Sequence, residues 1–552
     1  ATNLVATDQV LDSPTLNYCT MNPIDSNGSI ASSEGNLKVT TTSTDPRMNA
    51  TFQIPSTGKW YWEFLMQYST SMMIGVIDQS RSGNAYEGNQ SVLYSSGLGT
   101  KYNFSSVASY GATWTTGDLM GVAFNRDDNE ITFYKNNSAQ PTLTIGGTAA
   151  QRARLMPMIG TGTDGTGGGT FNFGQDSSFA GAKTAQGNGD DGEDFYYTPP
   201  TGYKALNTDN LDDPAIALPT DYFDTTLYAG TAATHTISSL AFQPDFLWIK
   251  ARTQPYQHSL RDSVRGSTKT VRSNDTTAEE TQAASVTSFN SDGWSMGADP
   301  DAFVNYSTST YVGWAWKGGG TASSNGDGSI TSSVSANTTA GFSIVSYTGT
   351  GANATVGHGL SQTPELIIFK NLPDTEDWIV YSEPVGSGGG LFLDHTNATD
   401  ADGLYFNSTS PTSSVFTVGS QNRSNGSSNA MIAYAWHSVE GYSKVGSYTG
   451  NGVNDGTFVY TGFRPMWVMA KCTDGSGSWL MTDSVRFPYN VTDDPLFANE
   501  SSAETNSSTY AIDILSNGFK CRGVNNDTNN SSGNVYVYLA FAESPFKTSN
   551  AR

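Results

Sequence analysis

Residues 58–64 read Gly-Lys-Trp-Tyr-Trp-Glu-Phe, and this stretch decides the fold class of the first third of the chain. Its large rings recur at every second position, at Trp60, Trp62 and Phe64, and the residues between them face the other side. A period of two residues is typical of a β-strand that buries one face. The stretch therefore predicts a strand whose three rings point into a core.

A hairpin pattern follows at residues 118–136. Apolar residues alternate from 120 to 124, the turn Asn-Arg-Asp-Asp-Asn occupies 125–129, and the alternation resumes from 131 to 133. Asp and Asn suit such a turn because their short side chains bond locally to the backbone and tolerate a left-handed conformation. With a further aromatic strand at 170–174, the pattern predicts a two-sheet antiparallel sandwich. Helices, if present, are expected to be single turns.

The motifs between residues 45 and 180 resemble a known family. They are the strand at 58–63, Ile-Gly-Val at 74–76, Gly-Asp at 117–118, Gly-Val-Ala-Phe at 121–124, the strand at 131–136 and Phe-Asn-Phe-Gly at 171–174. In this order they resemble a SPRY domain, a concanavalin-like β-sandwich, and we expect Trp62, Phe124 and Phe133 in its core. SPRY domains are binding modules whose loops at one end choose the partner. The resemblance implies recognition rather than catalysis and defines no binding residue.

The rest of the chain carries three copies of a weak pattern. Each copy has a strand ending in tyrosine, a proline before an apolar run that ends near a lysine, a hairpin-like segment, and a closing aromatic strand. The tyrosines are Tyr228, Tyr347 and Tyr448, the prolines Pro244, Pro364 and Pro465, the lysines Lys250, Lys370 and Lys471, the hairpin segments 289–294, 402–406 and 514–519, and the closing strands 311–316, 431–436 and 536–541. A spacing of roughly 100 residues or more is too long for a solenoid repeat and predicts tandem β domains in a row.

The first copy carries a second resemblance. Phe-Gln-Pro-Asp at 242–245, Leu-Trp-Ile-Lys at 247–250, Asp-Ser-Val-Arg-Gly at 262–266 and the strand at 311–317 resemble a module common in tail-fibre-like and virion proteins of marine bacteriophages. Residues 11–19 and 22–23 resemble the join that follows an upstream domain in such proteins. The Asp-Ser-Val-Arg element recurs at 483–486 in the third copy and is absent from the second. The resemblance implies a virion appendage.

We therefore expect an all-β chain, with an antiparallel sandwich of the SPRY type followed by three related β domains. The expected segments are an N-terminal join at 1–44, the sandwich at 45–180, an acidic Gly-rich linker at 181–220, repeat 1 at 221–320, a Ser/Gly linker at 321–340, repeat 2 at 341–438 and repeat 3 at 439–552.

Composition narrows the function. Charged residues are 14% of the 552, with 28 basic against 51 acidic and a net charge of −23, which disfavours nucleic acid and anionic membranes as partners. No apolar stretch approaches the ~18 residues that a spanning helix needs, so we expect no membrane insertion. No signal peptide is visible, and because the first residue is Ala1, either a start methionine was removed or the chain is a fragment.

Candidate chemistry is sparse. Of the three cysteines, Cys472 and Cys521 could pair, or all three, including Cys19, are isolated buried thiols. No histidine lies within four residues of another, and the acidic stretch 187–194 lacks the regular calcium-loop register. No Gly-x-Ser-x-Gly elbow appears in a suitable context. We expect no catalytic, cofactor-binding or metal-binding residues, and the ligand-binding residues stay unknown. The histidines are His235, His258, His358, His395 and His437.

These observations predict a non-enzymatic structural and attachment protein on the virion surface, a phage fibre or appendage. Its expected partners are other virion proteins, a host cell-surface glycan or protein, and further copies of itself in a trimer. The alternatives are a capsid decoration protein, a tail-associated glycan hydrolase or lyase, and a cellular surface adhesin.

Overall fold

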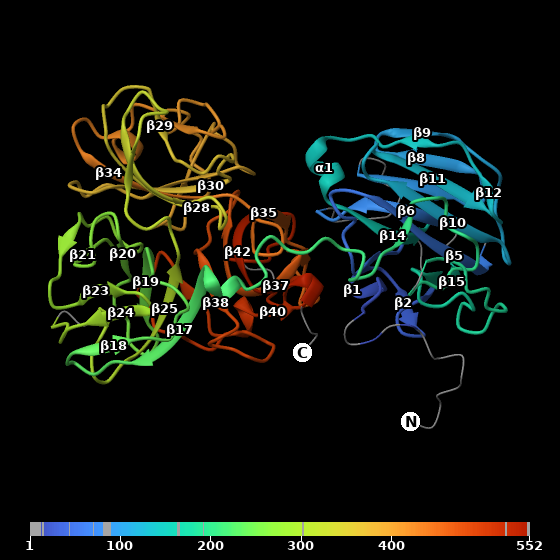
Figure 1. Cartoon of the computed structure of the whole chain (residues 1–552), viewed down its shortest axis with the longest axis horizontal. Coiled ribbons are helices and arrows are strands. Elements are labelled where there is room, and N and C mark those ends of the chain that lie inside the picture. The colour runs from blue at the N-terminus through green and yellow to red at the C-terminus, as the bar shows by residue number, and fades with distance from the viewer. Residues whose placement is uncertain are drawn as a thin grey trace. The chain divides into compact units, whose positions relative to one another are not determined.

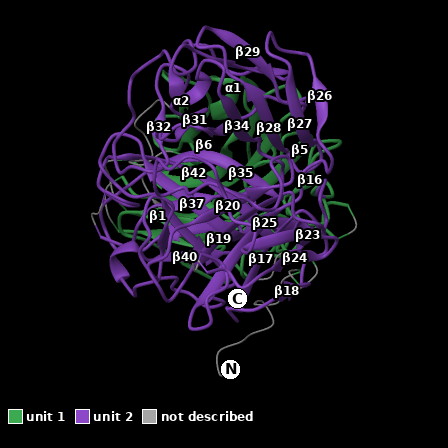
Figure 2. Ribbon diagram, turned by 90° about the vertical axis from the view of Figure 1, so that its left-hand side faces the viewer, with its two compact units in different colours: residues 1–213 green, residues 214–552 purple. Residues whose placement is uncertain are grey.

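The computed structural model describes residues 11, 13, 16–42, 45–69, 71–80, 90–162, 166–190, 192–300, 303–524 and 527–548. The chain divides into two compact units, residues 1–213 and 214–552 (Figure 2). The described part is almost entirely β, which confirms the predicted fold class. Its helices are single turns: α1 (Ala149–Ala153), α2 (Asn422–Asn425) and the 3-10 turns η2 (Pro219–Asp221), η3 (Ser508–Tyr510) and η4 (Phe546–Thr548). None of these helices is long and apolar enough to cross a membrane.

Unit 1 is a β-sandwich of two large sheets. In spatial order, the seven-stranded sheet holds β1 (Met21–Asn27), β4 (Arg47–Ala50), β14 (Leu155–Thr161), β6 (Met72–Asp78), β7 (Ser91–Ser95), β8 (Thr100–Asn103) and β9 (Ser106–Ser109). The nine-stranded sheet holds β12 (Ser138–Ala139), β11 (Glu130–Lys135), β10 (Leu119–Asn125), β5 (Lys59–Ser69), β15 (Gly167–Asn172), β3 (Lys38–Thr41) and β2 (Ile30–Ser33), with β13 (Leu143–Thr144) beside β11 and β16 (Lys204–Ala205) beside β5.

The predicted strands and core of unit 1 are confirmed. The quoted stretch lies in β5, and β10 and β11 form the predicted hairpin, with Phe124 opposite Ile131. Its turn ends at Asn129, whose φ of 53° is left-handed. Trp62, Phe124 and Phe133 are fully buried.

The other face of β5 is also covered, by the segment that the sequence predicts to be a linker. Residues 187–190 and 192–205 fold back over it, and β16 pairs with β5 in parallel. The Glu63 carboxylate accepts the backbone N–H groups of Tyr196 (2.9 Å) and Tyr197 (2.8 Å), and an Asn172 amide N–H at 3.2 Å. Burial raises the pKa of Glu63 to about 7. The acidic, glycine-rich composition gave no sign of this packing, because its anchor is a side chain on a distant strand.

Unit 2 contains three large sheets with one strand order, which agrees with the repeat read from the sequence. Figure 1 shows the three repeats in green, yellow to orange, and red. In repeat 1 the order is β17 (Phe223–Ala229), β25 (Thr310–Trp316), β19 (Phe246–Ala251), β20 (Ser259–Asp262). In repeat 2 it is β28 (Phe342–Thr348), β34 (Ala430–Trp436), β30 (Leu366–Asn371), β31 (Ile379–Ser382), β32 (Leu391–Phe392). In repeat 3 it is β35 (Ser443–Thr449), β42 (Val535–Pro545), β37 (Phe463–Cys472), β38 (Leu480–Asp483), β39 (Leu496–Phe497).

A small sheet accompanies each large one. These are β18 (His235–Ile237), β24 (Gly293–Met296) and β23 (Val286–Asn290); β29 (Ala354–Gly357) and β33 (Val415–Val418); and β36 (Phe458–Tyr460), β41 (Gly518–Cys521) and β40 (Ile512–Leu515). Repeat 1 also holds the pair β21 (Lys269–Thr270) and β22 (Glu280–Thr281). The hairpins predicted at 289–294 and 514–519 are confirmed, but residues 402–406 form turns, because β29 pairs directly with β33 and needs no second partner.

The closing strands β25, β34 and β42 bury both faces. Alternate side chains of each pack either into the repeat's own outer core or into one central core that all three repeats share. Trp316, Trp436 and Phe541 hold equivalent central positions, and Trp316 contacts the other two rings at centroid distances of 6.3 and 5.6 Å. The repeats therefore surround a common centre, whereas the sequence predicted domains in a row. A strand that is apolar on both faces needs cover on both sides, and here the second cover comes from the neighbouring repeats.

The interval predicted to be the Ser/Gly linker 321–340 is also part of a sheet. Strands β26 (Ser323–Asn325) and β27 (Ser332–Asn337) extend the sheet of repeat 2 beside β28. Serine-rich strands carry little apolar alternation, so the sequence pattern concealed them.

Hydrogen bonds close the three repeats into a ring. The residue just before β20, β31 and β38 is His258, Trp378 and Trp479 respectively, and each side chain bonds a backbone carbonyl of another repeat. Trp378 Nε1 donates to the carbonyl of Arg272 and Trp479 Nε1 to that of Phe392, both at 2.7 Å. His258 Nε2 lies 3.0 Å from the carbonyl of Phe497. Repeat 2 thus bonds repeat 1, repeat 3 bonds repeat 2, and repeat 1 bonds repeat 3.

The Asp-Ser-Val-Arg elements are buried ion pairs at the joints of this ring. In repeat 1, Asp262 pairs with Arg265 and accepts the Tyr434 hydroxyl of repeat 2 at 2.8 Å. In repeat 3, Asp483 pairs with Arg486 at 2.6 Å and accepts Trp314 Nε1 of repeat 1 at 3.1 Å. At both joints, an aromatic side chain of the neighbouring repeat donates a hydrogen bond to the aspartate.

The joint of repeat 2 is apolar instead. Strand register places Ser382 of repeat 2 at the position that Asp262 holds in repeat 1 and Asp483 in repeat 3. The neighbouring closing strand presents Leu539 to this joint, at the position that Tyr434 and Trp314 hold at the other two joints. Val385 stands in place of the arginine and packs against the central core. At the joint of repeat 2, the aromatic hydrogen-bond donor, the aspartate and the arginine are all replaced. This explains why the second copy lacks the Asp-Ser-Val-Arg element.

We predict that Arg265→Val lowers the free energy of unfolding by about 3–5 kcal/mol, because it leaves the Asp262 carboxylate buried without its base. Adding Asp262→Ser and Tyr434→Leu copies the apolar joint and recovers most of that loss. Denaturant titration of the full chain measures both effects. A triple variant no more stable than Arg265→Val would contradict this account of the joint.

Candidate functional site

A pocket of about 520 Å³ lies between repeats 1 and 2. It is lined by Gln243, Asp245, Lys317, Gly318, Gly319, Gly320, Ala336, Asn337 and Thr338. The Asp245 carboxylate holds its floor by accepting the backbone N–H of Gly318 at 2.8 Å. Burial raises the pKa of Asp245. The pocket therefore combines a carboxylate that is hydrogen-bonded to the backbone with amide, hydroxyl and ammonium groups.

Three consecutive glycines create the space. A Cβ on Gly318 would lie 2.9 Å from Cβ of Asp245, and one on Gly319 would lie 2.4 Å from the carbonyl oxygen of Ala336. Side chains are excluded at Gly318 and Gly319 by this close approach, whereas a Cβ on Gly320 would meet nothing within 4 Å and glycine there is favoured by its φ of 75°. At the next joint the equivalent residue is Ser438, whose N–H donates to Glu365 at 2.8 Å, and residues with side chains follow it.

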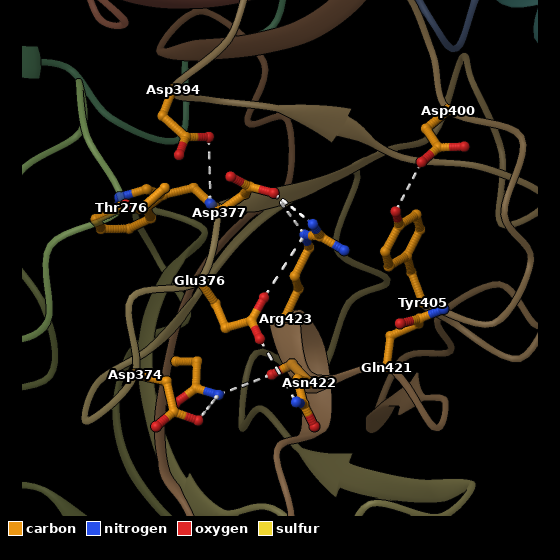
Figure 3. A network of polar contacts seen from close by, with 12 residues as sticks. Thr276, Asp374, Glu376, Asp377, Asp394, Asp400, Tyr405, Gln421, Asn422 and Arg423 are labelled. Carbon is orange, nitrogen blue, oxygen red and sulfur yellow. Dashed lines mark hydrogen bonds and ion pairs between the residues drawn. The ribbon is translucent and has the colours of Figure 1, made fainter.

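A second polar cluster lies in repeat 2, on the loop between β30 and β31 (Figure 3). Asp377 accepts both Nε (2.8 Å) and Nη2 (2.5 Å) of Arg423, which comes from α2. His395 Nε2 lies 3.3 Å from the other oxygen of Asp377. The neighbouring Asp394 accepts the backbone N–H of Trp378 at 3.3 Å. Burial raises the pKa of Asp394 to about 7.

The buried lysine of repeat 2 anchors this loop. Lys370 Nζ donates to the carbonyls of Glu376 (2.7 Å), Asp374 (3.3 Å) and Thr276 of repeat 1 (3.1 Å). Lys471 is held similarly by carbonyls of repeats 2 and 3, whereas among the described residues Lys250 donates only to the carbonyl of Ala251, at 2.8 Å. Burial lowers the pKa of Lys370 and Lys471 to about 8 and that of Lys250 to about 7.

The structure places the cysteines, the repeated tyrosines and the histidines that the sequence analysis named. Cys19, Cys472 and Cys521 are isolated buried thiols, so the alternative of a Cys472–Cys521 disulfide is wrong. The repeated tyrosines Tyr228, Tyr347 and Tyr448 each donate a hydroxyl to a carbonyl near the closing strand. Among the histidines, His258 and His358 are buried, and His395 belongs to the polar cluster.

Sequence reasoning missed one buried polar residue in each repeat. Asn305, Asn425 and Asn530 each stand six residues before the second position of the closing strand, and their side chains accept one backbone N–H and donate to two carbonyls. Aligning the three copies on their closing strands would have found this asparagine.

Comparison with known families matches both units. Residues 218–545 match the family described as "Domain of unknown function (DUF7483)", and residues 59–176 match the SPRY domain. The first match spans more than half of the 552 residues. The chain belongs to the DUF7483 family. The DUF7483 region spans the three repeats, and its description names neither a virus particle nor a ligand.

Solved structures similar to part of the chain include the following three, two of which are named as SPRY-type domains. The SPRY domain of human HERC1 has 15% identity and a TM-score of 0.24, over 27% of this chain and 96% of its own. Stonustoxin has 18% identity and 0.24, over 28% of this chain and 27% of its own. The PSpry domain of TRIM65 has 13% identity and 0.23, over 28% and 92%. No curated protein matches.

The lysines allow a direct test. We predict that Lys370→Met lowers the melting temperature, because three carbonyls lose a charged donor, at roughly 1–3 kcal/mol for each group left unpaired. Lys250→Met leaves only the carbonyl of Ala251 unpaired and removes a buried charge, so its melting temperature at pH 7 stays equal or rises.

The same pair differs in pH dependence. Between about pH 7 and the ordinary lysine pKa near 10.5, unfolded Lys250 binds a proton that the folded residue does not, so wild-type stability rises with pH in this window. Lys250→Met removes the contribution of this residue, including the rise between about pH 7 and pH 8, whereas Lys370 and Lys471, whose pKa is lowered to about 8, still contribute above pH 8. Thermal melts from pH 7 to pH 10 measure both effects, and an equal loss in the two variants at pH 7 would refute the distinction.

Proposed function

We propose that this chain is a non-enzymatic recognition protein of a virus particle that binds a glycan on the host surface. The observation that carries the proposal is the pocket at the joint of repeats 1 and 2. Its groups are suited to hydroxyl-rich ligands: Gln243 and Thr338 are exposed, and Lys317 adds one positive charge in a chain of net charge −23. Polar groups placed on a rigid wall fix the orientation of a ligand.

The first unit supports recognition in another way. Residues 59–176 match the SPRY domain, and the resemblance to that family implies partner choice by loops at one end of the sandwich. Two recognition elements in one chain suit attachment to a repetitive surface, because linked weak sites raise avidity by about 10²–10⁴ without new contacts. The virion location and the fibre or appendage role rest on the resemblance of the first repeat to phage tail-fibre-like modules.

We predict that Gln243→Ala combined with Thr338→Ala weakens glycan binding at least about tenfold, since each exposed polar group would lose its bond to the ligand. Thr363→Ala, at the position in repeat 2 that corresponds to Gln243, is the matched control and keeps wild-type affinity. An array of bacterial surface glycans, followed by titration of the best ligand, measures the change.

Two outcomes would refute the proposal. Unchanged affinity in the double variant would remove the pocket from recognition. Cleavage of the bound oligosaccharide on long incubation would favour the alternative of a glycan hydrolase or lyase. Labelled chain on intact particles would distinguish tail from capsid, and its absence from particles would favour a cellular adhesin.

We also propose that copies of the chain assemble as a homotrimer, as cyclic symmetry and avidity favour. The shared core of unit 2 removes one reason for this, because the repeats already bury their apolar faces against one another. Light scattering over a concentration series tests it: we expect three times the mass of one 58.8 kDa chain, and the mass of a single chain throughout would refute the trimer.

A further inference from the structure

One position is structurally equivalent in the three repeats, and its residue type differs only in repeat 2. The backbone N–H of the residue before β20, β31 and β38 donates to a side-chain oxygen from a later loop. The acceptors are Asn274 at 3.0 Å, Asp394 at 3.3 Å and Asn499 at 2.8 Å. The acceptor of this N–H group is therefore an asparagine in repeats 1 and 3 and an aspartate in repeat 2.

In repeats 1 and 3 the asparagine also donates to a neighbour. Asn274 Nδ2 bonds the side-chain oxygen of Gln257, and Asn499 Nδ2 bonds the hydroxyl of Ser478 at 3.2 Å. Each pair thus sets an amide donor against a neutral acceptor. The position of Gln257 and Ser478, just before the ring-closing residue, belongs to Asp377 in repeat 2.

Repeat 2 therefore places two carboxylates where the other repeats have a donor and an acceptor. Asp394 is 9% exposed, and its Oδ2 has no hydrogen-bond partner among the described residues. Ligand atoms of Asp377, Asp394 and His395 all lie within 4.8 Å of one another. A buried carboxylate oxygen with no donor is costly unless a cation approaches it.

The geometry points to a divalent transition-metal site, of the Zn²⁺ class, formed by Asp377, Asp394 and His395. Two carboxylate oxygens and an imidazole nitrogen are ligands that Zn²⁺ accepts, with water completing the coordination. Calcium instead takes 6–8 oxygen ligands, and the imidazole does not suit it. The side chain of His395 is 41% exposed, which leaves the site open to an entering ion.

Neighbouring groups hold the ligands in place. Arg423 occupies Oδ2 of Asp377 and leaves the oxygen that faces His395 available, and the backbone of Trp378 fixes the other oxygen of Asp394. Such outer contacts orient ligands in metal sites. The same arginine partly neutralises the acids, so the site suits one dication rather than a cluster of ions.

The test is zinc titration of the full chain after treatment with a chelator. Calorimetry with ZnCl₂ counts the ions bound, and thermal melts record stabilisation by the bound ion. The decisive variant is Asp394→Asn, because asparagine is the residue that repeats 1 and 3 carry at this position, and its amide can donate to Asp377. We expect it to stay folded, to bind one zinc fewer and to lose the zinc-dependent rise in melting temperature.

Two further variants sharpen the result. His395→Ala, at a half-exposed position, is expected to weaken zinc binding by about tenfold or more. Asp292→Asn removes an equal charge from an exposed turn and keeps the wild-type stoichiometry. Equal zinc binding by the wild type and Asp394→Asn would overturn the site. So would an Asp394→Asn variant that is more stable without any difference in zinc, because the two acids would then share a proton instead of an ion.

Discussion

The architecture of residues 214–552 depends on the burial of both faces of the closing strands. In β25, β34 and β42 the side chains on one face fill an outer core within the repeat, so the large rings on the other face, Trp316 and Trp436 among them, must find another cover. Each repeat covers the others. A fully buried aromatic side chain contributes several kcal/mol, and a domain of about 100 residues that exposed this face would be marginal. The ring is thus a condition for stability of its parts.

Polar contacts give the ring its order. An apolar core alone would tolerate several arrangements of three similar sheets, because apolar packing is weakly directional. The ring-closing residues His258, Trp378 and Trp479 each need a carbonyl from one particular neighbour, and the Asp262 and Asp483 ion pairs each need a donor from one particular closing strand. Buried pairs of this kind add little net stability but penalise a wrong partner strongly. They specify which repeat follows which.

The sequence alone was sufficient to predict the features that follow from local alternation of apolar and polar residues. Trp62, Phe124 and Phe133 could be placed in a core because the period of two residues is visible within a few positions. The shared core could not be foreseen, since alternation shows that a strand has two apolar faces but not what covers the second. The packing of residues 187–190 and 192–205 onto Glu63 was hidden for a similar reason, because the decisive contact joins positions more than 100 residues apart. For the candidate sites, spacing rules failed: Asp377 and Asp394 are 17 positions apart along the chain and meet because β31 pairs with the short strand β32, which the sequence pattern did not show.

An internally repeated protein provides its own comparison, and the departures from the repeat are of two kinds. At the joint of repeat 2, Ser382, Val385 and Leu539 have all changed together, so no charged group is left buried without its counterpart, although the Ser382 hydroxyl has no hydrogen-bond partner among the described residues. At Asp377 and Asp394 two changes leave a buried oxygen without a donor. The glycine turn at 318–320 is intermediate: its backbone N–H groups donate to Oδ2 of Asp245, while Oδ1 has no hydrogen-bond partner among the described residues, and the turn lacks the side chains that follow Ser438 at the next joint. A compensated departure is explained by packing alone. An uncompensated one carries a cost in stability, which the proposed partners, an ion at the acid pair and a glycan at the glycine turn, would offset.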